Sequence, residues 1–262
     1  MRYNRAMKTL ILGLSLAISS QLHASTPSYC VAHRSLGYGG LENSLEAFSN
    51  AIQGEADGIE FDLRHTKDRK TIIFHDKKLK RVSKGQNCDL KSPIHELTLA
   101  QISQNCLLQN GEVIPTFEEG LLLLSQSQTR LLIEFKDETI TDSDLELIKN
   151  YYSDRPELVS VISFNRNILE VVEQKAKSDV FFQKIGTVRL KKWGFFGDLG
   201  NISALSTKYI HRSRVQKLQA KGIKVGAYTK DSAKRIQKYL NKGVDFITTN
   251  NSLLCKQIIS KQ

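Results

Sequence analysis

The amino-acid sequence predicts an α/β protein, and three features carry that prediction. Short runs of β-branched and aromatic residues alternate with amphipathic stretches, as in a parallel sheet covered by helices. Several of these runs end in acidic residues or histidine. The length of 262 residues suits a single barrel domain of about 250 residues. We therefore expect an irregular TIM (β/α)8 barrel whose polar residues meet where the strands end.

The expected strands are short and follow the β-branched and aromatic runs. They are Cys30–Ala32, Gly58–Leu63, Thr71–Phe74, Leu131–Phe135, Val159–Phe164, Val180–Gln183, Ile202–Leu205, Lys224–Tyr228 and Asp245–Thr249. These runs outnumber by one the eight strands of a closed barrel. Leu63 and Thr71 also lie too close in the chain to hold a crossover helix. Either the barrel is irregular at this point or one of the runs is not a strand.

The expected helices fall between many of these strands. They are Ser44–Gly54, Phe117–Ser125, Asp142–Tyr152, Arg166–Ser178, Ser213–Lys221 and Ser232–Lys242. In the first, Leu45, Phe48 and Ile52 recur at the three- and four-residue spacing of an amphipathic helix. Asn43 is expected to cap this helix, with Glu46 completing a capping box.

Residues 77–115 do not follow the alternating pattern. The segment is polar, contains two cysteines and follows the strand that ends at His75. We expect a small insertion within one domain that spans residues 25–262.

The first 24 residues have the pattern of a secretory signal peptide. Arg2, Arg5 and Lys8 precede an apolar run. That run covers Leu10–Ile18, and small and polar residues then lead to Ala24, after which we expect cleavage. The run is too short for a helix that spans ~30 Å of hydrocarbon, which argues against an uncleaved anchor. We therefore expect an exported protein, either periplasmic or secreted.

Export would place the four cysteines in an oxidising compartment, where they can pair. Cys88 with Cys106 is the favoured pair, because both lie in the polar segment 77–115. Cys30 and Cys255 lie near the two ends of the mature chain, which a closed barrel brings together. They either form a second bridge or stay as small buried side chains.

The formal net charge of +11 fits attraction to phosphates, nucleic acid or an anionic membrane without choosing among them. Nothing else in the sequence favours nucleic acid, so we expect no nucleic-acid partner. The basic run from Lys77 to Lys84, which contains Arg81, is either a solvated face or recruits anionic substrates or lipid head groups. The aromatic cluster Trp193–Phe196 could cage a quaternary ammonium group, insert at a membrane interface or pack under a loop.

Polar residues end four of the predicted strands. They are His33 and Arg34, Glu60 and Asp62, His75, and Glu134 with Lys136. Because the strand ends of a (β/α) barrel meet at one mouth, we expect these side chains to converge. We expect His65, His95 and His211, which lack this context, to lie at the surface.

Three of these residues are carboxylates with the spacing of a cation site. Glu60 and Asp62 are two residues apart, so both face the same side of their strand. With Glu134 they offer three hard oxygen ligands, which suit Mg²⁺ or Ca²⁺ better than zinc. The alternative is ion pairing, of Glu60 and Asp62 with Arg34 or Arg64, and of Glu134 with Lys136.

The ordered set of motifs points to a known family. The motifs are His33-Arg34, Leu41-Glu42-Asn43-Ser44, Asp57–Leu63, Phe74-His75-Asp76, Ile114–Glu119, Ile133–Lys136, Ser163-Phe164 and Gly243–Thr249. In these motifs the sequence resembles the glycerophosphodiester phosphodiesterases. The resemblance covers most of the mature chain and is weakest between about residues 77 and 112 and between about 180 and 222.

The resemblance implies a TIM-barrel hydrolase that cleaves a glycerophosphodiester to glycerol 3-phosphate and an alcohol. It implies that His33 and His75 are the general acid and base. Histidine suits both tasks, because its pKa of ~6.5 leaves either protonation state accessible near neutrality. The nucleophile stays open between water and the glycerol hydroxyl of the substrate itself.

The resemblance also implies how the charge of the phosphodiester is balanced. One divalent cation, Ca²⁺ or Mg²⁺, would be held by Glu60, Asp62 and Glu134. The substrate would be bound by Arg34 at its phosphate, by Lys136 close by and by Tyr228 as an aromatic wall. A cation and a guanidinium would together offset the charge that grows on the equatorial oxygens.

Three positions depart from the family pattern. Ser35 stands where the family usually has glycine, so we expect a restricted backbone and a crowded phosphate site. Ser44 replaces threonine as a helix-capping residue, which is a mild change. Tyr228-Thr229 replaces a Trp-Thr pair.

Two alternative functions stay open. The same site could carry out phospholipase D-type cleavage of lysophospholipids, with transient contact to a membrane or a lysolipid. An exported barrel that binds phosphate or lipid without turnover is the other alternative. The head group, the choice between Mg²⁺ and Ca²⁺ and the oligomeric state are not specified by the sequence.

Overall fold

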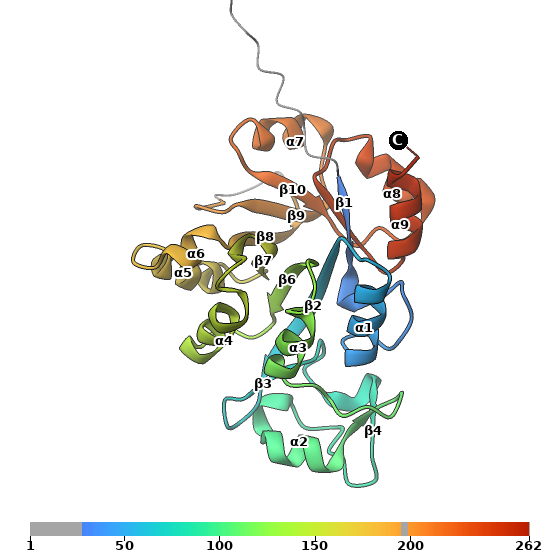
Figure 1. Cartoon of the computed structure of the whole chain (residues 1–262), viewed down its shortest axis with the longest axis vertical. Coiled ribbons are helices and arrows are strands. Elements are labelled where there is room, and N and C mark those ends of the chain that lie inside the picture. Colours follow the sequence, from blue (N-terminus) through green and yellow to red (C-terminus); the bar gives the residue numbers. More distant parts are fainter. Residues whose placement is uncertain (1–27, 195–198, 262) are drawn as a thin grey trace, which may run out of the picture.

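The computed structural model describes residues 28–194 and 199–261, and within them eight parallel strands close into a barrel (Figure 1). The strands are β1 (Tyr29–Ala32), β2 (Gly58–His65), β6 (Arg130–Phe135), β7 (Val159–Ser163), β8 (Gly186–Trp193), β9 (Ala204–Tyr209), β10 (Lys224–Ala227) and β11 (Phe246–Thr249). The barrel closes at β1, which pairs in parallel with both β2 and β11. The predicted (β/α)8 barrel is therefore confirmed. The predicted leader, residues 1–24, lies outside the described residues.

The extra predicted run is a strand that lies outside the barrel. β3 (Thr71–Ile73) pairs antiparallel with the end of β2. Between them the chain turns over residues 66–70, where the N–H of Thr66 donates to the carbonyl of Lys70 at 2.8 Å. The short spacing that excludes a crossover helix therefore makes a hairpin, and the expected irregularity is found at this point.

The predicted strand over Val180–Gln183 is wrong. These residues form the short helix α6 (Val180–Lys184), and the next strand, β8, begins at Gly186. Asp179 caps the helix, because its side chain accepts a hydrogen bond from the N–H of Phe181. Adjacent apolar residues are buried here within a helix, which hydrophobic periodicity alone does not distinguish from a buried strand.

The longer helices surround the barrel (Figure 1). They are α1 (Leu45–Gln53), α3 (Phe117–Leu124), α4 (Asp142–Tyr152), α5 (Arg166–Lys175), α7 (Arg212–Gln219), α8 (Ala233–Leu240) and α9 (Ser252–Ile259), with 3-10 turns η1 (His33–Ser35) and η4 (Pro156–Leu158). Of these, the six helices from α1 to α8 were predicted, whereas α9 and the two 3-10 turns were not. The predicted cap of α1 is wrong by one residue, because the hydroxyl of Ser44, not Asn43, accepts from the N–H of Ala47 at 3.0 Å.

Residues 77–115 project from the barrel beside β3 (Figure 1). They contain η2 (Leu79–Arg81), β4 (Ser83–Lys84), η3 (Ile94–Glu96), α2 (Leu99–Asn105) and β5 (Leu107–Leu108). Leu79, Ile94 and Ile102 are buried in a small apolar cluster that includes Phe74 at the end of β3. This polar segment therefore has a core of its own, which its sequence pattern did not show. Cys88 and Cys106 are paired, as predicted.

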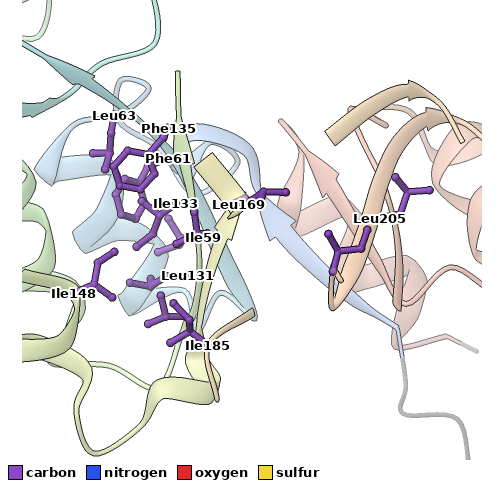
Figure 2. Packing of buried hydrophobic residues seen from close by; sticks show 14 of the residues in the cluster. Ile59, Phe61, Leu63, Leu131, Ile133, Phe135, Ile148, Leu169, Ile185 and Leu205 are labelled. Atoms are coloured by element: carbon purple, nitrogen blue, oxygen red, sulfur yellow. The ribbon is translucent and has the colours of Figure 1, made fainter. Parts of the chain in front are cut away.

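The alternation of side chains along β2 decides which residues reach the barrel interior. Ile59, Phe61 and Leu63 are buried in the main core between the sheet and the helices (Figure 2), where each contributes about 1.5–3 kcal/mol. Successive side chains of a strand point to opposite faces, so Glu60 and Asp62 face the interior of the barrel. The apolar face of β2 thus anchors the strand in the core, while its opposite face holds two buried carboxylates.

The second disulfide joins Cys30 of β1 to Cys255 of α9. Of the two alternatives that the sequence left open, the structure has the bridge. It ties the last described helix to the first strand.

None of the described helices is both long and apolar enough to cross a membrane.

Candidate active site

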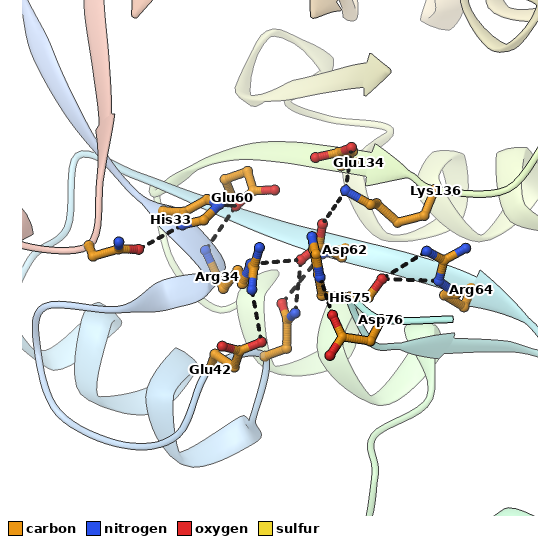
Figure 3. A network of polar contacts seen from close by, with 12 residues as sticks. His33, Arg34, Glu42, Glu60, Asp62, Arg64, His75, Asp76, Glu134 and Lys136 are labelled. Atoms are coloured by element: carbon orange, nitrogen blue, oxygen red, sulfur yellow. Dashed lines mark hydrogen bonds and ion pairs between the residues drawn. The ribbon is translucent and has the colours of Figure 1, made fainter. Parts of the chain in front are cut away.

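The predicted site residues come together at the carboxyl ends of the barrel strands (Figure 3). A cavity of about 220 Å³ opens there. Its lining includes His33, Arg34, Glu60, His75, Glu134, Lys136 and Tyr228. Asp62 is fully buried beside them. Chain segments that are far apart in the sequence therefore present one polar cluster, as the strand-end argument predicted.

Three buried carboxylates form the centre of this cluster. Oxygen atoms of Glu60, Asp62 and Glu134 all lie within 4.8 Å of one another. Among the described residues, Glu60 Oε1 and Asp62 Oδ1 have no hydrogen-bond partner. Buried, unpartnered carboxylate oxygens are costly unless a cation balances them. The donor set therefore fits one hard divalent cation.

The pKa shifts of the three acids also favour a bound cation. Burial, together with the charge of Asp62, raises the pKa of Glu60 to about 8 and the pKa of Glu134 to about 7. Burial acts on Asp62 too, but the positive charges of Lys136 and Arg34, with the hydrogen bond from Asn43, outweigh it and hold the pKa of Asp62 below its usual value. Without a further positive charge, the three acids resist full ionisation at neutral pH.

Lys136, the residue after β6, supplies part of the positive charge that balances the three acids. Its Nζ donates to Glu134 Oε1 at 2.7 Å and lies 3.4 Å from Asp62 Oδ1. The ion pair weighed as an alternative role for Glu134 is thus present. It leaves Glu60 Oε1 without a hydrogen-bond partner in the described chain, so the pairing and a cation site are compatible.

His33 is oriented by a chain of polar contacts. Its Nδ1 lies 2.7 Å from Asn250 Oδ1, and the Asn250 amide in turn donates to Asp231 Oδ2 at 3.1 Å. Because the Asn250 amide nitrogen is used by Asp231, its oxygen is left to accept from His33 Nδ1. His33 Nε2 then carries the lone pair, on the side of Glu60, whose Oε2 is 4.0 Å away. Burial and the charge of Arg34 lower the pKa of His33.

His75 is held in a similar way by its neighbour in the sequence. Its Nδ1 lies 2.6 Å from Asp76 Oδ1, and its carbonyl oxygen accepts two hydrogen bonds from Arg64, at 3.0 and 2.9 Å. Since a carboxylate accepts, His75 Nδ1 carries the proton and Nε2 is free for chemistry. Burial lowers the pKa of His75. Both histidines therefore favour the neutral form.

Arg34 bridges the acids from η1. Its backbone N–H donates to Glu60 Oε2 at 2.8 Å, and its Nη1 donates to Glu42 Oε1 at 3.1 Å. Its Nε lies 3.4 Å from Asp62 Oδ2. The guanidinium thus lies at the rim of the carboxylate cluster, where it can face an anionic group.

Ser35 does not crowd this rim. It has the left-handed backbone that glycine would adopt freely, with φ of +62°, so the expected restriction is real. However, its side chain is fully buried, and Oγ donates to the carbonyl of Ala47 in α1 at 2.9 Å. The predicted crowding of the phosphate site is therefore wrong, because the hydroxyl points into the helix.

Much of the remaining lining of the cavity is apolar. Tyr228 packs edge-on against Phe164, with ring centroids 5.9 Å apart, and Leu132, Ile162 and Leu190 also line the cavity. Tyr228 thus lies where the predicted aromatic wall should be. Of the cluster Trp193–Phe196, Trp193 stacks on Tyr209 at 4.7 Å, while Phe195 and Phe196 lie outside the described residues.

His65 is not a surface residue, contrary to the prediction. Its Nε2 lies 2.9 Å from Asp144 Oδ2 and its Nδ1 lies 3.3 Å from Asp137 Oδ2. It is the last residue of β2, pairs with Thr71 of β3 and contacts Asp144 of α4, a packing that single-residue context does not reveal. His95 and His211 are exposed, as expected.

Sequence reasoning also missed the residues that hold the histidines and acids in place. Asn250 and Asp231 lie behind His33, and Asn43, assigned as a helix cap, hydrogen-bonds Asp62. Asn43 lies within one motif of the family resemblance and Asn250 directly follows another, which was the available signal. Their contacts cross long stretches of chain, so only the fold reveals them.

A closed (β/α)8 barrel with an acidic cluster and two oriented histidines at its carboxyl face defines the class of TIM-barrel enzymes, whose chemistry occurs at this end. The sequence profile of the Glycerophosphoryl diester phosphodiesterase family matches residues 33–254. The chain therefore belongs to this family of phosphodiesterases, and the resemblance seen in its motifs is confirmed.

Individual relatives agree with the family match. A glycerophosphodiester phosphodiesterase of Bacillus altitudinis is 28% identical over 232 residues, covering 84% of this chain and 93% of its own. One of Caldanaerobacter subterraneus is 26% identical over 235 residues, with the same coverage of 84% and 93%. The structure of an Oleispira antarctica phosphodiesterase in complex with the product sn-glycerol-3-phosphate superposes with a TM-score of 0.74 at 23% identity, covering 89% of this chain and 97% of that one. This last likeness shows that the fold is shared.

Proposed function

We propose that this protein hydrolyses glycerophosphodiesters to glycerol 3-phosphate and an alcohol, with His33 and His75 as its general acid and base. One observation carries the proposal. Two imidazoles, each held at Nδ1 by a hydrogen-bond partner, line the same cavity as Glu60 and Glu134, two of the three clustered carboxylates. Family membership and the glycerol 3-phosphate held by the Oleispira antarctica phosphodiesterase support the choice of substrate.

The charges of the site suit a phosphodiester. A divalent cation, Mg²⁺ or Ca²⁺, held by Glu60, Asp62 and Glu134 would polarise the phosphoryl group and offset its growing negative charge. Arg34 would bind a phosphate oxygen through its guanidinium. Lys136 would add a second positive charge beside the carboxylates. Between them, these groups would lower the repulsion that protects a phosphodiester from nucleophiles.

The two histidines would exchange protons with the reacting oxygens. One imidazole would take a proton at Nε2 from the nucleophile, either water or the glycerol hydroxyl of the substrate. The other would deliver a proton from Nε2 to the leaving alkoxide. Attack by the glycerol hydroxyl would first give a cyclic glycerophosphate, which water would then open to glycerol 3-phosphate. Burial keeps both histidines neutral in the free protein, which suits the base, while the negative phosphate would favour the protonated form of the acid.

We further propose that residues 1–24 direct export and are removed, so that the mature enzyme works in the periplasm or the medium. The charged start, the short apolar run and Ala24 support this. The pairing of all four cysteines in two disulfides supports an oxidising compartment.

Substrate choice tests the proposal. Purified protein from Ser25 onward would be incubated with deacylated glycerophosphodiesters and, in parallel, with lysophospholipids of the same head groups. We expect glycerol 3-phosphate from the deacylated substrates. Cleavage of the lysophospholipids alone would replace the proposal with a phospholipase D-type activity. Binding of both without cleavage would favour a non-catalytic barrel.

A further inference from the structure

Arg81 differs from the other basic residues in the run from Lys77 to Lys84. It ends η2, two residues after Leu79, which is fully buried in the small core of residues 77–115. Its guanidinium bridges two carboxylates that lie outside this segment. Nε donates to Asp76 Oδ2 at 2.6 Å, and Nη1 donates to Glu42 Oε2 at 2.8 Å. Arg81 therefore turns toward the active site.

Each of these two carboxylates also holds one group of the proposed machinery. Asp76 uses its other oxygen, Oδ1, to bind His75 Nδ1 at 2.6 Å. Glu42 Oε1 accepts from Arg34 Nη1 at 3.1 Å, and the same oxygen also accepts from Arg81 Nη2. One guanidinium thus connects the imidazole of His75 to the phosphate-binding side chain of Arg34, through a carboxylate on each side.

The backbone that presents Arg81 is braced. Gln109 Nε2 donates to the carbonyl of Arg81 at 2.8 Å, and the Gln109 N–H donates to the carbonyl of Val82 at 2.9 Å. Val82 is buried in the same small core as Leu79. The core of residues 77–115 therefore fixes the position from which the guanidinium reaches the rim.

The energetics favour a positioning role over a role in stability. The Arg81 side chain is 46% exposed, and exposed ion pairs typically contribute ~1 kcal/mol or less. A planar guanidinium, however, fixes the geometry of the carboxylates that it binds, which an ammonium group does not. Without Arg81, Glu42 and Asp76 would each lose one partner, and both would be freer to rotate.

We propose that Arg81 is a positioning residue that sets the orientations of His75 and Arg34 together. This role rests on the proposed function of the site. Residues 77–115 would then contribute to the reaction, because they place a positive charge that orients side chains at the rim of the cavity without contacting the substrate. A small displacement of a reacting group can cost about 10²-fold in rate.

Three variants test the role. Arg81→Ala should lower kcat by ~10- to 10²-fold while the melting temperature stays near that of the wild type. Guanidinium ion at non-denaturing concentrations should restore part of the loss. Arg81→Lys keeps the positive charge but loses the planar guanidinium, so its kcat should fall between those of the wild type and Arg81→Ala. Lys80→Ala removes the same charge one residue earlier, from an exposed side chain without an ion pair in the described chain, and should leave kcat unchanged.

Two results would overturn the role of Arg81 while leaving the proposed function intact. One is an Arg81→Ala rate equal to that of Lys80→Ala. The other is a loss of rate that follows a lowered melting temperature and is not rescued by guanidinium. Calorimetric binding of glycerol 3-phosphate gives an independent readout, and we expect weaker binding to Arg81→Ala. A wild-type protein that neither releases nor binds glycerol 3-phosphate would overturn the proposed function, and the role of Arg81 with it.

Discussion

Asn43 binds Asp62 at two points. Its Nδ2 donates to Asp62 Oδ2 at 3.0 Å, and its Oδ1 accepts from the backbone N–H of Asp62 at 3.3 Å. Asn43 is buried in the loop before α1 and has a left-handed backbone, with φ of +57°, which asparagine tolerates better than most residues. One amide therefore fixes both the backbone and the carboxylate of a proposed cation ligand.

Asn43→Gly should weaken cation binding. Glycine keeps the left-handed backbone but removes both hydrogen bonds to Asp62. Partners of this kind typically change metal affinity by ~10- to 100-fold when removed, and calorimetric titration with Mg²⁺ or Ca²⁺ measures the change. Asn43→Ala adds backbone strain and should unfold at a lower temperature than Asn43→Gly. Equal cation affinity in wild type and Asn43→Gly would show that Asp62 needs no such support.

His33→Ala and His75→Ala should each lower turnover by ~10²-fold or more without loss of fold. Each removes one of the two groups that exchange protons in the proposed reaction. His95→Ala is the matched control, because the His95 side chain is 71% exposed and lies outside the cavity. Rates near those of this control in both variants would end the acid and base assignment.

In EDTA, with no cation bound, the protein should lose stability as the pH rises. The folded-state pKa of Glu60 is raised to about 8, from a usual 4.5, because the side chain is buried beside Asp62. Between about pH 4.5 and 8 the unfolded chain has released a proton that folded Glu60 retains, so stability falls across this window. Melting temperatures measured in EDTA at several pH values check this fall.

Added cation should reverse that loss, because it binds the ionised carboxylates of the folded state only. Glu60→Gln should flatten the pH dependence in EDTA and raise the cation concentration needed for activity. If the wild-type protein in EDTA were equally stable at pH 5 and pH 8, Glu60 would not be held in a desolvated position. An unchanged cation titration in Glu60→Gln would remove Glu60 from the ligand set.

His65 should stabilise the fold mainly in its charged form. Burial lowers the pKa of His65, but hydrogen bonds to Asp137 and Asp144 outweigh burial and raise it to about 9. Because the folded pKa exceeds the unfolded value of ~6.5, the contribution is full below pH ~6.5 and is lost as the pH rises through about 9. Denaturant melts of wild type and His65→Gln, both with cation bound, should converge near pH 9. A stability difference that stays constant from pH 6 to 9 would contradict the charged pairing.

The barrel and the acidic cluster could be predicted because both follow from local patterns. The alternation in β2 puts Ile59 and Phe61 on one face and Glu60 and Asp62 on the other, so one strand predicts two carboxylates inside the barrel. The strand over Val180–Gln183 failed where the local pattern is ambiguous, since a short buried helix has the same apolar run.

The residues that orient the site could not be predicted in the same way. Asn250 lies 217 residues from His33 in the chain, and their contact exists only because β1 and β11 are neighbours in the closed barrel. Arg81 was one basic residue among several until the small core of residues 77–115 placed it on Glu42 and Asp76. Ser35 shows that even a recognised departure needs its side-chain direction before its effect can be judged.

Release of glycerol 3-phosphate after restoring the cation tests the central claim most directly. Purified protein from Ser25 onward would be stripped with EDTA and given a panel of glycerophosphodiesters, with Mg²⁺ or Ca²⁺ then added in excess. We expect no release in EDTA and release once the cation is restored, at a rate that His33→Ala and His75→Ala do not reach. A folded, cation-bound protein that releases glycerol 3-phosphate from none of the diesters would contradict the account.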